Sequence, residues 1–249
     1  MLPADFLTRP IAHRALHDKA AGRVENSPSA IQAAIDKGYG IEIDLQLSKD
    51  GVPMVFHDYA LNRLTNETGA VAQRTSAELS QITLAGGTDT IPTLEEVLEQ
   101  VSGRVPLLIE IKDQDGALGP KVGPLEDATA ALLKDYKGPV AVMSFNPHSV
   151  AHMATVLPDI PRGLTTCNYV SEDWPTIPKV TRERLALIPD YETAGACFIS
   201  HQHDELDAKR VAELAEMGAK IVCWTIRSTE EEKNARQIAD NITFEGYLA

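Results

Sequence analysis

The sequence of 249 residues has few cysteines, few aromatic side chains and a deficit of positive charge. Its three cysteines, Cys167, Cys197 and Cys223, are far apart and form no CxxC pair, so they predict neither a zinc site nor a disulfide framework. Lysine and arginine number 23 against 36 aspartates and glutamates, which gives a formal net charge of -13. Such an acidic balance argues against a nucleic acid or an anionic membrane as partner. A small anionic substrate remains compatible if cations gather locally.

Long hydrophobic runs are also missing. No stretch of about 18 apolar residues occurs, and the N-terminus has neither the basic nor the apolar region of a signal peptide. Free cysteines are typical of a reducing compartment. We therefore expect a cytoplasmic protein with no stable membrane anchor, and the sequence leaves its oligomeric state unknown.

The chain does contain a regular alternation of short apolar runs with helix-like segments. Strands are predicted at residues 10–14, 41–47, 106–112, 139–145, 160–166, 196–201, 220–226 and 241–246. Helices are predicted at residues 28–37, from 93 onward, 121–136, 147–157, 174–188, 205–217 and 229–239. Eight strands and seven helices predict a (βα)8 TIM barrel, an α/β fold, as a single domain over residues 1–249 with the last helix missing or reduced. A doubly wound open sheet is the alternative, although no GxGxxG or Walker pattern supports it.

A small insertion after the second strand region is the main departure from a regular barrel. Residues 58–92 form a long, mostly polar connection, and connections of this length usually carry function. Its apolar side chains predict the core of a small cap over the barrel mouth: Leu61, Leu64, Leu79, Ile82 and Leu84.

The stretch of residues 41–58 combines carboxylates and a histidine on short apolar segments. Strict alternation over 41–47 places Glu42 and Asp44 on the same face of a strand. A turn at 48–51 and a second short strand then bring His57 to the same end. An amphipathic hairpin with one wet face would show the same alternation, so this stretch alone leaves both interpretations open.

The barrel prediction favours an active site over a wet hairpin. Charged side chains on buried strands are costly unless they are paired or bound to metal, and barrel enzymes place their chemistry at the carboxyl ends of the strands. Seven polar residues are predicted at those ends: His13, Arg14, Glu42, Asp44, His57, Glu110 and Lys112.

The types of these residues suggest their chemistry. Glu42, Asp44 and Glu110, without a nearby cysteine, suit a hard divalent cation such as Mg²⁺ or Ca²⁺. The two histidines can exchange protons near neutral pH, and the arginine and lysine supply positive charge that would hold a phosphate. Metal, acid–base groups and cations together suggest phosphoryl transfer.

In its motifs the chain resembles the glycerophosphodiester phosphodiesterase family over nearly its full length. The matching segments, in order, are His13-Arg14, Glu25-Asn26-Ser27, Glu42-Ile43-Asp44, Lys49-Asp50-Gly51, His57-Asp58, Ile91-Pro92-Thr93-Leu94-Glu95-Glu96, Glu110-Ile111-Lys112, Ser144-Phe145 and Trp224-Thr225. Three positions depart from the family pattern: Ala15 replaces a glycine, Val24 replaces a proline, and Glu245 stands where the closing T-D-F-P segment has aspartate.

This resemblance implies a metal-dependent enzyme that hydrolyses glycerophosphodiesters to glycerol 3-phosphate and an alcohol, through a cyclic phosphate formed by a glycerol hydroxyl. It implies a divalent ion on the three carboxylates, His13 and His57 as the acid–base pair, and phosphate contacts from Arg14 and Lys112. Trp224 is expected either to pack in the core or to form the floor of the substrate pocket.

Two other functions stay open. A lysophospholipase D or sphingomyelinase D-like enzyme would share the motifs, but it would need an apolar rim that the polar 58–92 segment does not suggest. A catalytically silent binding barrel should have lost at least one of the key residues, and none is missing. His17, His148 and His152 are expected to be ordinary loop or helix residues, whereas His201 and His203 could line the mouth.

Overall fold

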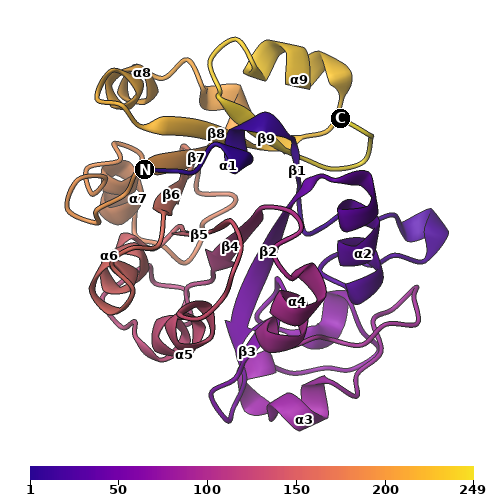
Figure 1. Cartoon of the computed structure of the whole chain (residues 1–249). Helices are drawn as coiled ribbons and strands as arrows, with labels where there is room; N and C mark the ends of the chain where they lie inside the picture. Colours follow the sequence, from indigo (N-terminus) through magenta and orange to yellow (C-terminus); the bar gives the residue numbers. More distant parts are fainter.

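The computed structural model describes all residues 1–249 and shows a closed ring of parallel strands (Figure 1). The strands of the ring are β1 (Ile11–Ala12), β2 (Gly40–Leu47), β4 (Leu107–Ile111), β5 (Val140–Ser144), β6 (Arg162–Thr166), β7 (Phe198–Gln202), β8 (Lys220–Ile226) and β9 (Asn241–Phe244). Strand β1 pairs with β2 on one side and with β9 on the other, which closes the barrel. The predicted TIM barrel is confirmed, and the open-sheet alternative is wrong.

Seven helices connect successive strands of the ring. They are α2 (Pro28–Lys37), α4 (Leu94–Val101), α5 (Pro124–Leu133), α6 (Pro147–Val156), α7 (Lys179–Leu185), α8 (Lys209–Glu216) and α9 (Thr229–Ala235). Two of their starts follow predicted signals: Ser27 caps α2 ahead of Pro28, and Thr93 and Glu96 form a capping box on α4. No helix follows β9, as expected. None of the helices has the length and hydrophobicity that crossing a bilayer requires.

Four predicted helices are clearly shorter than expected. The helix predicted at 121–136 is α5, which covers only Pro124–Leu133, and the one predicted at 229–239 is α9, which ends at Ala235. The helix predicted at 174–188 begins only at Lys179, because Pro175 and Pro178 lack a backbone N–H and disfavour helical geometry in the residues before them. The helix predicted at 205–217 is divided into a 3-10 turn at His203–Glu205 and α8.

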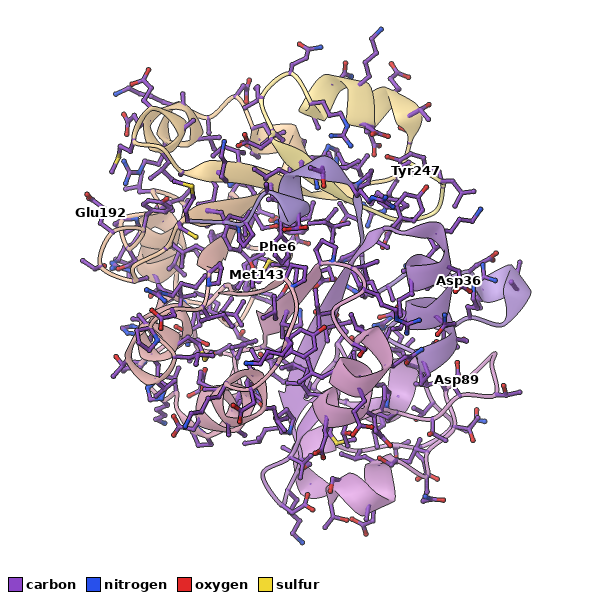
Figure 2. All side chains as sticks on the ribbon, viewed as in Figure 1. Phe6, Asp36, Asp89, Met143, Glu192 and Tyr247 are labelled. Atoms are coloured by element: carbon purple, nitrogen blue, oxygen red, sulfur yellow. The ribbon has the colours of Figure 1, made fainter.

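The first helix, α1 (Asp5–Thr8), closes the end of the barrel where the strands begin. Leu2 and Phe6 pack against apolar side chains near the starts of the strands. These are Ile11, Leu108, Ala141, Phe198 and Val222, with Met143 one layer further in. Figure 2 shows Phe6 and Met143 close together near the middle of the ring. This end of the barrel interior is therefore mostly apolar, and the charged side chains of the interior lie towards the other end.

Strand β2 is buried on both of its faces. Ile41, Ile43 and Leu45 belong to the large hydrophobic core between strands and helices. Glu42 and Asp44 on the opposite face are each about 1% exposed. The wet-hairpin interpretation is therefore wrong, because the polar face of this strand points into the barrel and not into solvent.

The segment after β2 has a small core of its own. Strand β3 (Pro53–Val55) runs antiparallel to β2, and α3 (Ser76–Leu79) follows within the insertion. The five apolar residues predicted to form its core all belong to one cluster with Met54 and Phe56. In Figure 1 this segment lies at the edge of the ring, beside β3 and α4. Its action as a cap over the mouth stays a prediction.

Candidate active site

A cavity of about 140 Å³ lies inside the barrel towards the carboxyl ends of its strands. Every residue predicted for the site lines it: His13, Arg14, Glu42, Asp44, His57, Glu110, Lys112 and Trp224. A larger groove of about 990 Å³ lies outside the ring, between α2 and residues 246–248, and shares none of these residues. The cavity inside the barrel is therefore the candidate active site, because the predicted catalytic, metal-binding and substrate-binding residues line it.

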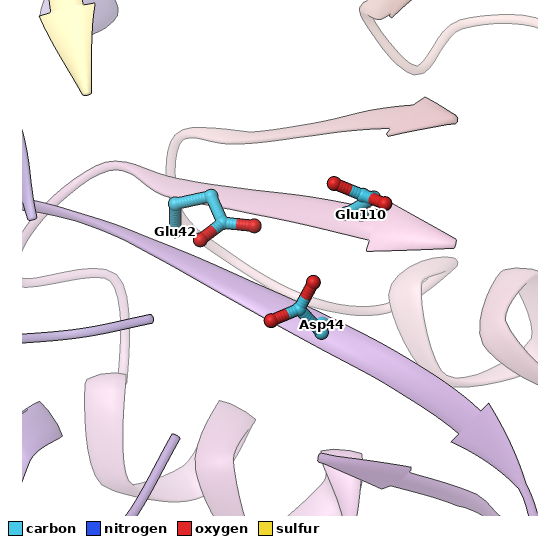
Figure 3. A group of neighbouring side chains, drawn as sticks. All are labelled: Glu42, Asp44 and Glu110. Carbon is cyan, nitrogen blue, oxygen red and sulfur yellow. The ribbon is translucent and has the colours of Figure 1, made fainter. Parts of the chain in front are cut away.

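Three carboxylates converge at this cavity. Glu42 and Asp44 project from β2, and Glu110 projects from β4 on the same side of the sheet (Figure 3). Asp44 and Glu110 are register partners on adjacent strands, which brings their side chains together. One oxygen of each carboxylate lies within 4.8 Å of the others, and all three residues are buried.

Two cations partly balance this negative charge. Lys112 Nζ lies 2.9 Å from Asp44 Oδ1 and 2.7 Å from Glu110 Oε1. The Arg14 Nε lies 3.6 Å from Asp44 Oδ2. Burial alone would raise the pKa of Asp44, but Lys112, His57 and Arg14 together hold that pKa far below its usual range. Asp44 is therefore ionised at neutral pH.

Asn26 orients Asp44 through two hydrogen bonds. Its Nδ2 donates to Asp44 Oδ2 at 2.9 Å, and its Oδ1 accepts from the Asp44 backbone N at 3.2 Å. The residue adopts a left-handed backbone with φ of 60°, a conformation that asparagine tolerates better than most residues. Asn26 belongs to the family-like motif Glu25-Asn26-Ser27, but the sequence predicted no role for it.

The carboxylate of Glu42 forms no ion pair with a lysine or arginine side chain. Burial and the neighbouring Asp44 and Glu110 raise the pKa of Glu42 well above its usual value. The Arg14 backbone N donates to Glu42 Oε2 at 2.8 Å and offsets only part of this cost. Three buried oxygen donors with uncompensated negative charge fit a hard divalent ion such as Mg²⁺ or Ca²⁺.

Both histidines of the cavity are held in the same way. His13 Nδ1 lies 2.6 Å from Glu245 Oε2, and His57 Nδ1 lies 2.7 Å from Asp58 Oδ1. Neither Nε2 has a hydrogen-bond partner in the protein. Burial lowers the pKa of His13 although Glu245 opposes the shift, so this ring is neutral near pH 7. A neutral imidazole with a free nitrogen can accept a proton.

A network of ion pairs connects the insertion to the site. Arg63 donates to Asp58 through Nε at 2.7 Å and to both oxygens of Glu25 at 2.8 Å. Glu25 in turn accepts from Arg14 at 2.8 Å. Arg63 thereby supports the partners of both His57 and Arg14. Glu25 and Asp58 belong to motifs that match the family, but no sequence pattern predicted a role for Arg63.

Glu245 was noted only as a departure from the family pattern, yet it lies beside the cavity. Besides His13, it contacts Arg227 Nε through Oε1 at 2.8 Å, and His17 Nε2 lies 3.5 Å from Oε2. Burial alone would raise the pKa of Glu245, but His13, His17 and Arg227 together hold that pKa far below its usual value. His17, expected to be an ordinary loop residue, thus faces a partly buried carboxylate.

Trp224 both packs and lines the cavity. Its Nε1 donates to the Ser200 carbonyl at 3.0 Å, and its ring meets that of Phe145 edge-on at 5.5 Å. Phe145 also lines the cavity. His201 is buried with its Nδ1 2.8 Å from Thr166 Oγ1, and neither it nor His203 lines the cavity.

Comparison with known proteins gives one consistent family. The model of the glycerophosphoryl diester phosphodiesterase family matches residues 13–240. A glycerophosphodiester phosphodiesterase of Bacillus altitudinis is 31% identical over 175 residues, covering 67% of this chain and 69% of that protein. One from Caldanaerobacter subterraneus is 32% identical over 179 residues, covering 67% of this chain and 70% of that protein.

A solved structure agrees with these relatives. It is that of an Oleispira antarctica phosphodiesterase in complex with its product sn-glycerol-3-phosphate, with a TM-score of 0.77 and 26% identity. The alignment covers 96% of this chain and 93% of that one. Because the family model covers all but the two ends of the sequence, the chain belongs to the glycerophosphoryl diester phosphodiesterase family of hydrolases.

Proposed function

We propose that this protein is a metal-dependent enzyme that hydrolyses glycerophosphodiesters to sn-glycerol 3-phosphate and an alcohol. The observation that carries the proposal is the set of three buried carboxylates within 4.8 Å of one another, in a cavity that two histidines also line. The product named for the Oleispira antarctica phosphodiesterase supports the glycerol 3-phosphate half of the substrate.

The carboxylates of Glu42, Asp44 and Glu110 would hold the divalent ion. When bound, such an ion neutralises negative charge on the phosphate oxygens and so favours attack at phosphorus. The unbalanced charge of Glu42 supports this assignment, since the residue is buried beside two other carboxylates. Without a cation, this site would repel an anionic diester.

The remaining lining residues would bind and orient the substrate. Arg14 and Lys112 carry the positive charge beside the carboxylates and would contact the phosphate oxygens. Trp224 and Phe145 provide an apolar side of the cavity, against which the carbon atoms of the substrate would pack.

The two histidines would move protons in two steps. His13 Nε2 accepts the proton of the glycerol hydroxyl next to the phosphate while its oxygen bonds to phosphorus. The bond to the departing alcohol breaks, and His57 donates a proton to that alcohol. In the second step, His57 takes a proton from water, the water oxygen opens the cyclic phosphate, and His13 returns its proton to the glycerol oxygen.

One assay tests both the metal and the nucleophile. Release of choline from glycerophosphocholine, with glycerol 3-phosphate as the other product, should stop in excess EDTA and return with Mg²⁺ or Ca²⁺. The analogue lacking the glycerol 2-hydroxyl should be inert, while the matched 1-deoxy control should react. Full turnover after verified metal removal would exclude the metal, and rapid hydrolysis of the 2-deoxy analogue would indicate direct attack by water.

A further inference from the structure

Glu245 is a charged group beside the cavity that the proposed reaction does not use. It follows the last residue of β9, and its side chain is 19% exposed. Its carboxylate faces three nitrogen-bearing side chains: His13, His17 and Arg227. A carboxylate so surrounded is ionised, and therefore it can only accept hydrogen bonds.

We propose that Glu245 is the positioning residue that fixes the tautomer and orientation of His13. Because the carboxylate accepts, the hydrogen of the neutral imidazole must lie on Nδ1, and the lone pair on Nε2 then points away from Glu245. This inference rests on the proposed function, in which His13 Nε2 removes the proton from the attacking hydroxyl.

The backbone and a second cation hold Glu245 in place. The His13 backbone N donates to the Phe244 carbonyl at 2.8 Å, and the Glu245 backbone N donates to the Ile226 carbonyl at 2.9 Å. Arg227 binds Oε1, and Oε2 lies 2.6 Å from His13 Nδ1, with His17 Nε2 further away at 3.5 Å. The ends of β1, β8 and β9 thus fix both partners of the hydrogen bond.

Among the charged groups around His13, Glu245 is the one anion that forms a hydrogen bond with the ring. Arg14 and Asp44 also act on the ring electrostatically, but no hydrogen bond joins either side chain to it. Glu245 therefore does for His13 what the adjacent Asp58 does for His57, although it comes from the opposite end of the chain.

Substitution by glutamine separates positioning from a purely structural ion pair. The glutamine side chain would keep the size of the glutamate, but its amide could donate to Nδ1 as well as accept from it, so that either tautomer becomes possible. In Glu245→Gln we expect kcat to fall by about 10²-fold or more with KM changed less than about threefold. The neutral amide neither fixes the tautomer nor stabilises the positive charge that His13 gains as a base, and a general base contributes about 10²–10⁴-fold. Glu245→Asp keeps an accepting carboxylate and should retain more activity than Glu245→Gln.

Long-range ¹H–¹⁵N spectra of the ¹⁵N-histidine-labelled protein at about pH 8, where the ring is neutral, read the tautomer directly. The His13 signal, identified with His13→Ala, should show a protonated Nδ1 in the wild type and a mixture of tautomers in Glu245→Gln. The control Glu230→Gln removes one exposed carboxylate of α9 and should leave both spectrum and kcat unchanged.

A wild-type spectrum with the hydrogen on Nε2 would overturn the proposal, even if Glu245→Gln failed to fold. So would Glu245→Gln with wild-type kcat and tautomer. Full activity of His13→Ala would instead refute the proposed role of His13 as base, and the spectra would still decide whether Glu245 fixes the ring.

Discussion

His13 and His57 occupy different surroundings although each binds a carboxylate through Nδ1. His13 is 14% exposed and sits beside the end of β9, whereas His57 is 28% exposed and its carboxylate is the next residue in the chain. The less exposed ring suits a base that must stay neutral, and the more exposed one suits an acid that exchanges protons with the departing alcohol and with water. Their proposed roles can be separated by the leaving group.

His57→Ala should slow release of choline from glycerophosphocholine by about 10²–10⁴-fold, the usual contribution of a general acid. It should spare a glycerophosphodiester of p-nitrophenol, because that anion leaves without a proton. His13→Ala should slow both reactions, as measured by steady-state kcat. The reverse pattern would exchange the two assignments, and small equal losses in both variants would mean that neither histidine is catalytic.

Glu110→Gln should weaken metal affinity by at least about tenfold, about 1.4 kcal/mol. Its metal-free form should melt at or above the wild-type Tm, since one of three crowded carboxylates is neutralised. Thermal melts across a Mg²⁺ titration measure both effects, because an ion that binds only the folded state raises Tm. Glu95→Gln, an exposed carboxylate on α4, is the control. A large loss of Tm without metal would identify Glu110 as a structural ion-pair residue.

The sequence predicted the residues that line the cavity better than the residues that hold them in place. Residues such as Glu42 and Glu110 could be found because they sit at inward positions of recognisable strands. The pairs Arg63 with Glu25 and His13 with Glu245 join residues 38 and 232 positions apart. No local pattern encodes such contacts, so they became visible only in the folded barrel.

At the scale of elements, the Lys49-Asp50-Gly51 motif proves to be a connector and not part of the cavity. Gly51, with φ of 81°, lets the chain turn between β2 and β3. Asp50 accepts from Ser48 Oγ at 2.6 Å, from the Ser76 backbone N at 2.7 Å and from Ser76 Oγ at 2.9 Å. The motif thereby attaches the hairpin to α3.

Asp50→Asn should lower Tm at neutral pH, and the difference from wild type should shrink on acidification. The hydrogen bond from Ser48 and that from the Ser76 backbone lower the pKa of Asp50 to about 2. A depressed pKa means that the ionised form stabilises the fold above the unfolded-state value of about 4, and that this contribution is lost as pH falls towards 2. Melts of both proteins from about pH 7 to about pH 3 test the sign. A deficit that stays constant with pH would show that the charge is irrelevant.

Arg63→Gln should lower kcat/KM by about tenfold while changing Tm little, since exposed ion pairs contribute about 0–1 kcal/mol. Its physical effect is to loosen Glu25 and Asp58, and through them Arg14 and His57. Arg74→Gln, which breaks an exposed pair with Glu67 in the same insertion, is the matched control. Equal kcat/KM values for the two variants would show that Arg63 does not support the active site.

Several elements followed from local signals in the sequence, although the helix predicted at 174–188 ignored Pro175 and Pro178. Helix α2 started at its serine cap, and β2 showed the period of a strand. The alternation in β2 could not reveal that its polar face was also buried, because closure of the ring decides that. Helix α1 is four residues long, too short for a periodic pattern, and was not predicted.

For the whole molecule, the net charge of -13 should act on the approach of substrate. A diester with a net negative charge is repelled at low salt, whereas zwitterionic glycerophosphocholine is affected far less. With saturating metal, kcat/KM for glycerophosphoglycerol relative to glycerophosphocholine should rise severalfold between about 10 mM and about 200 mM NaCl, where the screening length falls below about 10 Å. A ratio independent of salt would mean that local cations at the cavity dominate over the global charge.

The closing seam of the barrel has a consequence for the order in which function emerges during folding. Strand β1 has only two residues. Its pairing with β9, in which Ile11 lies opposite Thr243, joins the two ends of the chain. Such a non-local pair pays the largest loop-closure entropy and forms late. His13 follows β1 directly, and its hydrogen bond to Glu245 spans the same seam. Helices and most strands can therefore assemble while His13, the proposed base, is still absent from the cavity, so we expect activity to appear only when the ring closes.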